Sequence, residues 1–177
     1  MTERRRDRVY RQVTRALAVA LLPVAWLVAP GREREAAGQW ALAARYPAED
    51  LTGLTAATRA AIVAARTQAL WRDGVLIGVT SGFRDAQAQE RLYAAEVRLR
   101  GSAELARRRV LPAAHSRHVA GTAVDVRPDE AARWLERRGG RFGLYRVYDN
   151  EWWHFEYHPD GPPRRLPDPG ASFVELR

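Results

Sequence analysis

The chain carries Ser116-Arg-His-Val-Ala-Gly-Thr-Ala-Val-Asp125 and, further on, Glu151-Trp-Trp-His154. These two stretches offer two imidazoles and two carboxylates. Two histidines and one carboxylate can hold Zn²⁺ and leave a fourth position open for water. The remaining carboxylate can serve as the base of a hydrolytic zinc site. The two stretches therefore predict a catalytic zinc site in outline.

The first stretch is expected to turn and then run as a strand. Gly121 lies between His118 and Asp125, and their spacing requires the chain to turn and return along a strand rather than continue as one helix. Glycine supplies the conformational freedom for such a turn. Residues 122–126 then alternate, which places Ala123 and Asp125 on one face of the predicted strand.

The second stretch is expected to lie on a hairpin. Phe142–Tyr148 predicts one strand, Asp149-Asn150 a tight turn, and Trp152–Tyr157 the partner strand. His154 would reach the zinc site from this partner strand and share a face with the side chains two residues before and after it. Glu151 lies at the mouth of the turn, where it can take a proton from the zinc-bound water and later pass it to the leaving amine.

Helix signals surround these strands. Thr55 can cap a helix that ends near Gly74, and Asp85 can cap a second helix that ends at Gly101. Apolar residues recur at helical intervals in both segments: Ile62, Ala65, Ala69 and Leu70 in the first, and Leu92, Ala95 and Leu99 in the second. A third, short helix is expected from Pro128 to Leu135, closed by a pair of glycines.

The remaining segments of the compact part are less regular. Val75–Thr80 predicts a buried strand, whereas residues 101–114 are rich in arginine and predict irregular structure. From Pro159 onward, repeated prolines predict a tail that is either laid over the surface or disordered.

The N-terminus combines a basic region with an apolar one. Six arginines precede the apolar run Ala16–Ala29, which contains Pro23. The run is shorter than the roughly 20 residues that span a bilayer comfortably, and it is similar to the apolar core of an export signal. Leu27-Val28-Ala29 is a poor cleavage site, so an uncleaved anchor is also compatible with the pattern. Either case predicts the arginine end in the cytoplasm and the remainder outside. The alternative is an amphipathic helix docked on the domain.

Composition limits the possible partners and ligands. The formal net charge is +8, all 29 basic residues are arginine, and the first fifteen residues hold six arginines against Glu3 and Asp7. Half of the excess charge is therefore N-terminal, and we expect no nucleic-acid partner. The absence of cysteine excludes disulfides, cysteine zinc ligands and thiol nucleophiles. Histidines and carboxylates remain as the good metal ligands.

Three further residues are candidates for the site. Arg84 follows the predicted buried strand at its carboxyl end, where its planar guanidinium can bind a carboxylate or a developing oxyanion. His115 and His158 are alternative metal ligands, but neither has a carboxylate at an obvious second position, so we expect both near the site or on the surface.

The motif Ser116-x-His118-x-x-Gly121-x-Ala123-x-Asp125 with Glu151-x-x-His154 resembles the zinc D-alanyl-D-alanine carboxypeptidases of the VanY kind. The resemblance runs from about residue 50 to 158, because Ser81-Gly-Phe-Arg84 with Gln89 also resembles a family segment. Trp152 and Phe83 depart from the family's usual proline and tyrosine, and either change can shift specificity. The resemblance implies the following roles: His118, Asp125 and His154 as zinc ligands, Glu151 as catalytic base, and Arg84, Gln89 and Ser116 as substrate-binding residues.

The resemblance also implies a fold, an activity and a location. The fold is α+β, with a small antiparallel sheet carrying the zinc, helices packed on one side and the N-terminal apolar helix outside the domain. The activity that the resemblance implies is that of a zinc-dependent D,D-carboxypeptidase, which removes the C-terminal D-alanine from peptidoglycan stem peptides outside the cytoplasmic membrane. The alternatives are an L,D-carboxypeptidase or endopeptidase of the same superfamily, or a zinc-bearing binding module without turnover. The predicted parts are a signal or anchor (1–30), a connector (31–50), the zinc peptidase domain (51–160) and a Pro-rich tail (161–177).

Overall fold

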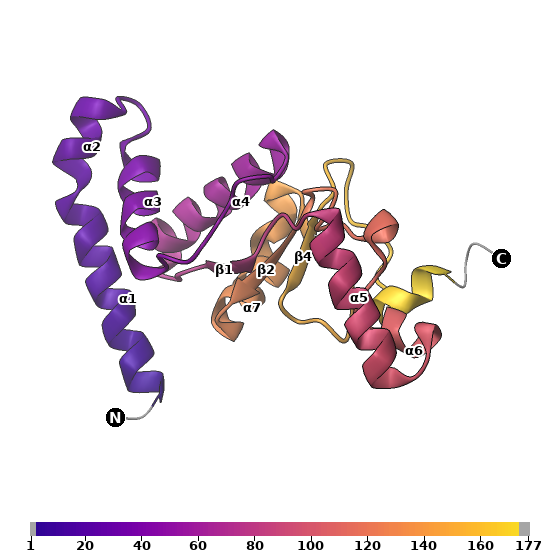
Figure 1. The fold of residues 1–177 in the computed structure, drawn as a ribbon. Coiled ribbons are helices and arrows are strands. Elements are labelled where there is room, and N and C mark those ends of the chain that lie inside the picture. Colours follow the sequence, from indigo (N-terminus) through magenta and orange to yellow (C-terminus); the bar gives the residue numbers. More distant parts are fainter. Residues whose placement is uncertain (1–2, 174–177) are drawn as a thin grey trace.

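The computed structural model describes residues 3–173, in which helices pack against a four-stranded antiparallel sheet (Figure 1). Along the sheet the strands follow the order β1-β2-β4-β3. This arrangement confirms the expected α+β class with a small antiparallel sheet. The strands are β1 (Gly78–Ser81), β2 (Ala123–Arg127), β3 (Leu144–Arg146) and β4 (His154–Tyr157); the helices are α1 (Glu3–Ala20), α2 (Leu22–Val28), α3 (Glu33–Arg45), α4 (Ala56–Gln68), α5 (Ala86–Arg100), α6 (Ala103–Arg107) and α7 (Asp129–Arg138).

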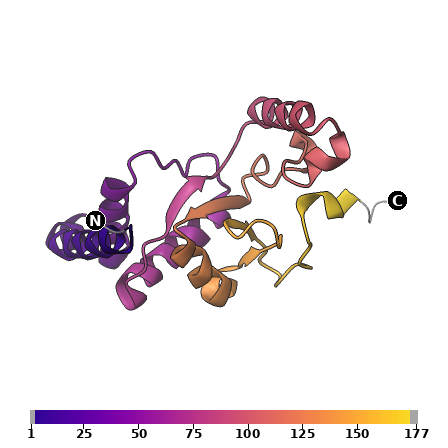
Figure 2. The same cartoon turned by 90° about the horizontal axis from the view of Figure 1, so that it is seen from below.

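The two faces of the sheet have different characters. Val124 and Val126 of β2 and Phe155 of β4 are buried in the core, together with apolar residues of α4 and α7. Because side chains alternate along a strand, Asp125 and His154 lie on the opposite face. These two residues are direct partners in the β2–β4 register. Figure 2 shows α7 on one side of the sheet and α5 with α6 on the other.

The helix α4 forms where its local signals predict. The hydroxyl of Thr55 accepts a hydrogen bond from the Thr58 backbone N–H, so Thr55 is the predicted N-cap. Ile62 and Ala65 are fully buried in the core. A short π-helical turn, Ala69–Asp73, extends the helix to Gly74, whose φ of 67° is the left-handed conformation expected of a terminating glycine.

The strand β1 and the β3–β4 hairpin differ in extent from the prediction. The predicted strand Val75–Thr80 begins three residues later, as β1 (Gly78–Ser81), while the apolar residues 75–77 before it are buried without a strand partner. β3 and β4 pair as the predicted hairpin and Asp149-Asn150 lies in a turn, but these two residues alone do not close the hairpin, because the β3–β4 connection runs from residue 147 to 153. Tyr148 forms an isolated bridge with Leu166 instead, and this non-local pairing draws the connection away from a tight hairpin.

The segment after β1 also differs from expectation. Asp85 caps α5 and Gly101 ends it, as predicted. Two leucines of this helix are exposed: 45% of the surface of Leu92 and 73% of that of Leu99 is accessible to solvent. The stretch predicted to be irregular contains α6, whose N-cap is Ser102.

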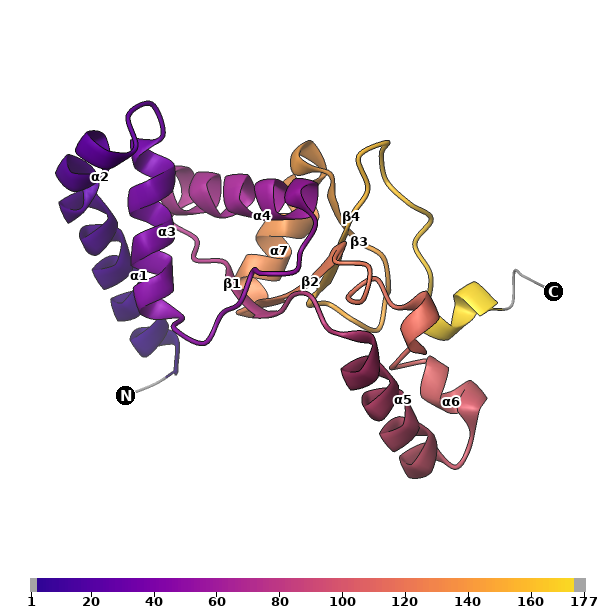
Figure 3. The ribbon, with the colours of Figure 1, turned by 45° about the horizontal axis from the view of Figure 1, so that its top comes forward.

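The tail and the N-terminal helices lie at opposite ends of the molecule (Figure 1). Residues 159–173 run over the surface and end in a 3-10 helix, Pro169–Phe173. At the other end, α1 and α2 pack on α3, and α3 packs on α4 (Figure 3). A second apolar cluster connects these layers through Ala18, Leu42 and Leu70.

The N-terminal helices are long and apolar enough to cross a membrane only when the two are taken together. No single described helix is long and apolar enough to span a membrane. One pair reaches this length and apolar composition together, Asp7–Ala20 with Leu22–Val28, and it is bent by 45° at the junction. The function of this segment and the predicted boundaries at residues 30, 50 and 160 stay predictions.

Candidate metal and substrate site

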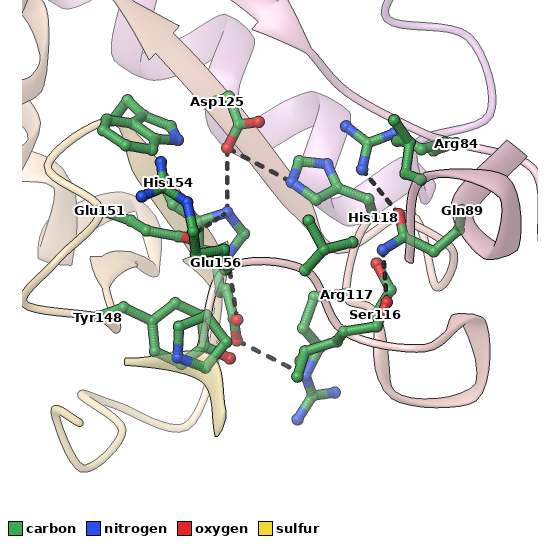
Figure 4. Close-up of a pocket in the computed structure, with 16 residues that line it drawn as sticks. Arg84, Gln89, Ser116, Arg117, His118, Asp125, Tyr148, Glu151, His154 and Glu156 are labelled. Atoms are coloured by element: carbon green, nitrogen blue, oxygen red, sulfur yellow. Dashed lines mark hydrogen bonds and ion pairs between the residues drawn. The ribbon is translucent and has the colours of Figure 1, made fainter. Parts of the chain in front are cut away.

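Three predicted ligands meet on the open face of the sheet, and we call them the metal trio: His118, Asp125 and His154. One potential ligand atom from each lies within 4.8 Å of the others. Asp125 Oδ1 is 3.0 Å from His154 Nδ1 and 3.4 Å from His118 Nε2 (Figure 4). The structure therefore brings residues from two strands and a loop to a single point.

The loop before β2 fixes the orientation of His118. Its Nδ1–H donates to the carbonyl of Gly82 at 2.7 Å, which leaves the lone pair of Nε2 facing Asp125. Its backbone carbonyl accepts hydrogen bonds from the N–H groups of Gly121 and Arg84. Gly121 has φ of 68°, and a Cβ atom there would lie 2.6 Å from the carbonyl oxygen of Gly53. The turn predicted from the spacing thus requires glycine for both conformation and space.

The environment of His154 is strongly polar although the residue is buried. Burial by itself would lower the pKa of His154, but hydrogen bonds to Asp125 and Glu156 outweigh it and raise the pKa to about 10. Burial likewise opposes ionisation of Asp125, yet hydrogen bonds from His118 and His154 hold the pKa of that carboxyl well below its usual range. The site is thus built to keep a carboxylate charged between two imidazoles.

The chemistry of the donor set fits a zinc ion. Two imidazole nitrogens and one carboxylate oxygen are a common protein ligand set of catalytic zinc, which retains an open position. The ring nitrogen of each histidine that points away from Asp125 meets an oxygen acceptor, the carbonyl of Gly82 for His118 and the carboxylate of Glu156 for His154. Such outer partners are typical of metal-ligating histidines.

Glu151 lies beside the metal trio. Its Oε2 is 3.9 Å from His154 Nδ1, and its side chain lines the same pocket. Burial raises the pKa of Glu151 to about 7, although the charge of His154 opposes the shift. The carboxyl group is therefore close to the metal position and has a proton affinity suited to general acid and base work.

The predicted substrate residues form the other wall of the pocket (Figure 4). The guanidinium of Arg84 donates to Gln89 Oε1 at 2.7 Å and to Ser81 Oγ at 2.8 Å. Gln89 is itself held by a hydrogen bond from its side-chain amide to the carbonyl of Leu111. Ser116 is buried and also lines the pocket, which encloses about 220 Å³. All seven predicted site residues thus face one cavity, and their individual roles stay predictions.

The structure also shows residues that the sequence did not assign. Arg109, Arg117, Tyr148 and Glu156 line the pocket. Alternation along the hairpin strand had placed Glu156 on the face of His154, but gave it no role. Tyr148 offered no signal, since its place beside His154 depends on the unexpected course of the β3–β4 connection.

Neither alternative histidine joins the metal trio. The ring of His115 packs against Phe173, with 4.6 Å between the ring centroids. His158 Nε2 is 3.0 Å from Glu156 Oε2, so it lies next to the site without being one of the three grouped ligands. Both histidines are where the sequence analysis expected them, near the site or on the surface.

Comparison with solved structures shows the same architecture in peptidases. The vancomycin-resistance D,D-pentapeptidase VanY from a VanB-type cassette, in complex with Zn(II), is 27% identical with a TM-score of 0.52, over 62% of this chain and 76% of that chain. VanYB in complex with D-alanine-D-alanine is 26% identical with a TM-score of 0.52, over 59% and 71%. The LD-carboxypeptidase LdcB is 28% identical with a TM-score of 0.51, over 62% and 66%.

Comparison of the sequence gives the family directly. No curated protein sequence matches the chain significantly. The family model described as VanY, D-alanyl-D-alanine carboxypeptidase, matches residues 54–160. This range is more than half of the chain and includes the metal trio, Glu151 and the predicted substrate residues. The chain therefore belongs to the VanY family of D-alanyl-D-alanine carboxypeptidases.

Proposed function

We propose that this protein is a zinc-dependent D,D-carboxypeptidase that removes the C-terminal D-alanine from peptidoglycan stem peptides. The observation that carries the proposal is the single pocket that joins the metal trio and Glu151 to Arg84, Gln89 and Ser116. A hydrolytic centre at one wall and a cation at the other suit a peptide that ends in a free carboxylate. The VanY-type neighbours, one with Zn(II) and one with D-alanine-D-alanine, support the same assignment.

The metal trio would hold the zinc ion, which as a Lewis acid polarises the scissile carbonyl and lowers the pKa of water. Glu151, on the adjoining wall, takes the proton of the attacking water and passes it to the leaving amine. Its burial keeps the carboxylate from being fully hydrated, which strengthens it as a base. Asp125 and the two imidazoles need no proton transfer of their own in this scheme.

Arg84 would bind the terminal carboxylate of the substrate. Gln89 and Ser81 use two of the five N–H donors of its guanidinium and hold its plane, so further donors remain for a ligand. Ser116 adds a hydroxyl to the same wall and can donate to the carboxylate or the developing oxyanion. These residues position the last peptide bond of a substrate rather than an internal one.

The experiment is the release of free amino acid from defined stem peptides by the zinc-loaded protein. We expect free D-alanine from the pentapeptide. An L,D-carboxypeptidase, favoured by the likeness to LdcB, would instead release D-alanine from the tetrapeptide. An endopeptidase would give two peptide fragments, distinguished by mass. No product from either peptide would contradict the enzyme proposal and favour the zinc-bearing binding module, although such a module has no need of Glu151.

The enzyme would act outside the cytoplasm, where its substrate lies. The α1–α2 pair offers an apolar outer surface for membrane attachment: Trp26, Leu27 and Val28 are each more than 60% exposed. The first fifteen residues of the sequence contain six arginines, a charge that anionic headgroups attract. We therefore place the protein in the cell envelope, attached through its N-terminal helices.

A further inference from the structure

We propose that Glu156 is a positioning residue that orients His154 for metal binding, by accepting a hydrogen bond from the ring nitrogen that faces away from Asp125. Glu156 Oε1 lies 3.2 Å from His154 Nε2, while His154 Nδ1 lies 3.0 Å from Asp125 Oδ1 (Figure 4). The imidazole is thus held between two carboxylates of different function. This inference rests on the proposed metal site and adds a residue to it.

The strand itself creates this contact. Residues 154 and 156 are two apart on β4, so their side chains point to the same face of the sheet. At this spacing a glutamate is long enough to reach the far nitrogen of a neighbouring imidazole. Both residues are buried, at 5% and 3% exposure, which protects the contact from competition by water. The spacing His-x-Glu on a strand thus places both side chains on one face, and their burial keeps them in contact.

The carboxylate of Glu156 is fixed from its other side. Its Oε2 is 3.0 Å from His158 Nε2 and 3.6 Å from Arg117 Nε. The ring of Tyr148 stacks on His154, with 5.4 Å between centroids and 30° between planes, and limits rotation of the imidazole. Because the imidazole of His154 and the carboxylate of Glu156 are both restrained, Glu156 Oε1 stays directed at His154 Nε2.

A carboxylate at this position selects one tautomer of the neutral ring. A proton on Nε2 donates to Glu156, so the lone pair is on Nδ1 and faces Asp125. A metal ligand needs that lone pair. The two histidines of the metal trio differ in this respect, because His118 is oriented by the backbone carbonyl of Gly82 and His154 by a side chain. Substitution can therefore remove the orientation of His154 alone.

The test is a comparison of Glu156→Gln and Glu156→Leu with the wild-type protein. Loss of an outer partner of a metal-ligating histidine typically weakens metal affinity about 10- to 100-fold. We expect a loss of this size for Glu156→Leu in competition with a chromophoric chelator, and a smaller loss for Glu156→Gln, whose amide oxygen still accepts a hydrogen bond. Glu104→Gln removes a charge at an exposed position of α6 and should leave the affinity unchanged.

Two spectroscopic readouts separate orientation from general packing. Nitrogen-15 NMR of the zinc-loaded wild-type protein should show His154 protonated at Nε2, and the visible spectrum of the cobalt-loaded protein should change in Glu156→Leu. Zinc affinity and cobalt spectrum that are both unchanged in Glu156→Leu would overturn the proposal. If Glu156→Leu does not fold, the test uses Glu156→Gln and the NMR spectrum of the wild-type protein. An unchanged zinc affinity of Glu156→Gln, together with His154 protonated at Nδ1 in the wild type, would then overturn the proposal. Neither measurement involves substrate, so failure to release D-alanine would leave this inference standing.

Discussion

Glu151 and His154 are only three residues apart, yet their side chains have separable tasks. We expect Glu151→Ala to keep zinc and to lose activity by about 100-fold or more, because proton transfer by a positioned side chain contributes about that much. We expect His154→Ala to lose zinc, because one of three ligands is gone. Zinc content and D-alanine release from the pentapeptide, measured on the same preparations, check both expectations. Full activity of Glu151→Ala would contradict the base assignment, and full zinc content of His154→Ala would contradict the ligand assignment.

Substitution of Gly121 tests the turn before β2. An alanine there would lower the stability of the fold in two ways, through its backbone conformation and through a steric overlap. Left-handed backbone costs a residue with a Cβ about 1–2 kcal/mol. A Cβ at Gly121 would also overlap the Gly53 carbonyl, and such overpacking costs about 1–3 kcal/mol more. Gly101, with φ of 71° and nothing near its Cβ position, is the matched control. Urea unfolding should show Gly121→Ala to be the less stable variant, and equal losses would mean that the turn can relax.

The C-terminal tail docks beside the pocket through Leu166, which forms a bridge with the pocket residue Tyr148. Arg165 binds Glu136 of α7 at 2.8 Å and Asp149 at 2.5 Å, next to the bridge between Tyr148 and Leu166. We expect Arg165→Gln to cost less than about 1 kcal/mol in global stability, since the ion pairs are half exposed. It should nevertheless speed hydrogen exchange at residues 147–149 and 166. Arg133→Gln, which removes an exposed pair within α7, is the control; equal exchange in the two variants would contradict this role.

The same contact gives the tail a defined dependence on pH. The hydrogen bond from Arg165 lowers the pKa of Glu136 in the folded protein, while partial burial opposes the shift. A carboxyl whose folded pKa is depressed stabilises the fold above its unfolded pKa and loses that contribution as the pH falls through the folded value. Exchange protection of residues 147–149 should therefore be constant near neutral pH and fall below about pH 4.5, the ordinary range of a glutamate. Protection that falls already between pH 7 and 6 would assign the change to another group.

The sequence predicted well those elements whose ends are set by residues close to them in the chain. The caps of α4 and α5 are set by Thr55 and Asp85, whose side chains bond the backbone three residues on, so short windows of sequence suffice. The β3–β4 connection is longer than predicted because Tyr148 pairs with Leu166, a partner that no short window of sequence contains. Leu92 and Leu99 follow helical spacing, but periodicity does not reveal whether another element covers that face.

The candidate site follows the same division. The metal trio was predicted because its spacing and residue types are a motif, and the structure groups the three residues. Glu156 was missed as a partner of His154, because strand alternation gives the face of a side chain but not the atom it reaches. Tyr148 and Arg117 enter the pocket through the folding of the connection and the loop before β2, which is tertiary information.

At the scale of the whole molecule, α1 and α2 form an outer layer at one end (Figure 1). Their inner side is buried against α3, as Thr14, Ala18 and Ala25 show. Their outer side is also apolar, which is unusual for a helix that faces water. The second apolar side has no covering element among residues 3–173. Gln89 and Leu92 of α5 line the pocket, and α5 lies away from α1 and α2 (Figure 1), so attachment through α1 and α2 would leave the pocket accessible to substrate.

This arrangement predicts that the full chain binds vesicles containing anionic phospholipid. Leu27 is 72% exposed on α2, and burying a leucine side chain contributes about 1.5–3 kcal/mol, so Leu27→Asp should weaken vesicle binding about tenfold or more. Leu99→Asp on α5, where leucine is 73% exposed, changes the same chemistry at a distant surface and should bind as the wild type does. Flotation of the three proteins with vesicles measures the difference. Salt should also weaken the binding, because the N-terminal arginines act through screened charge. Equal flotation of the two variants, or none of the wild-type protein, would show that the outer side of α1 and α2 is not a membrane surface.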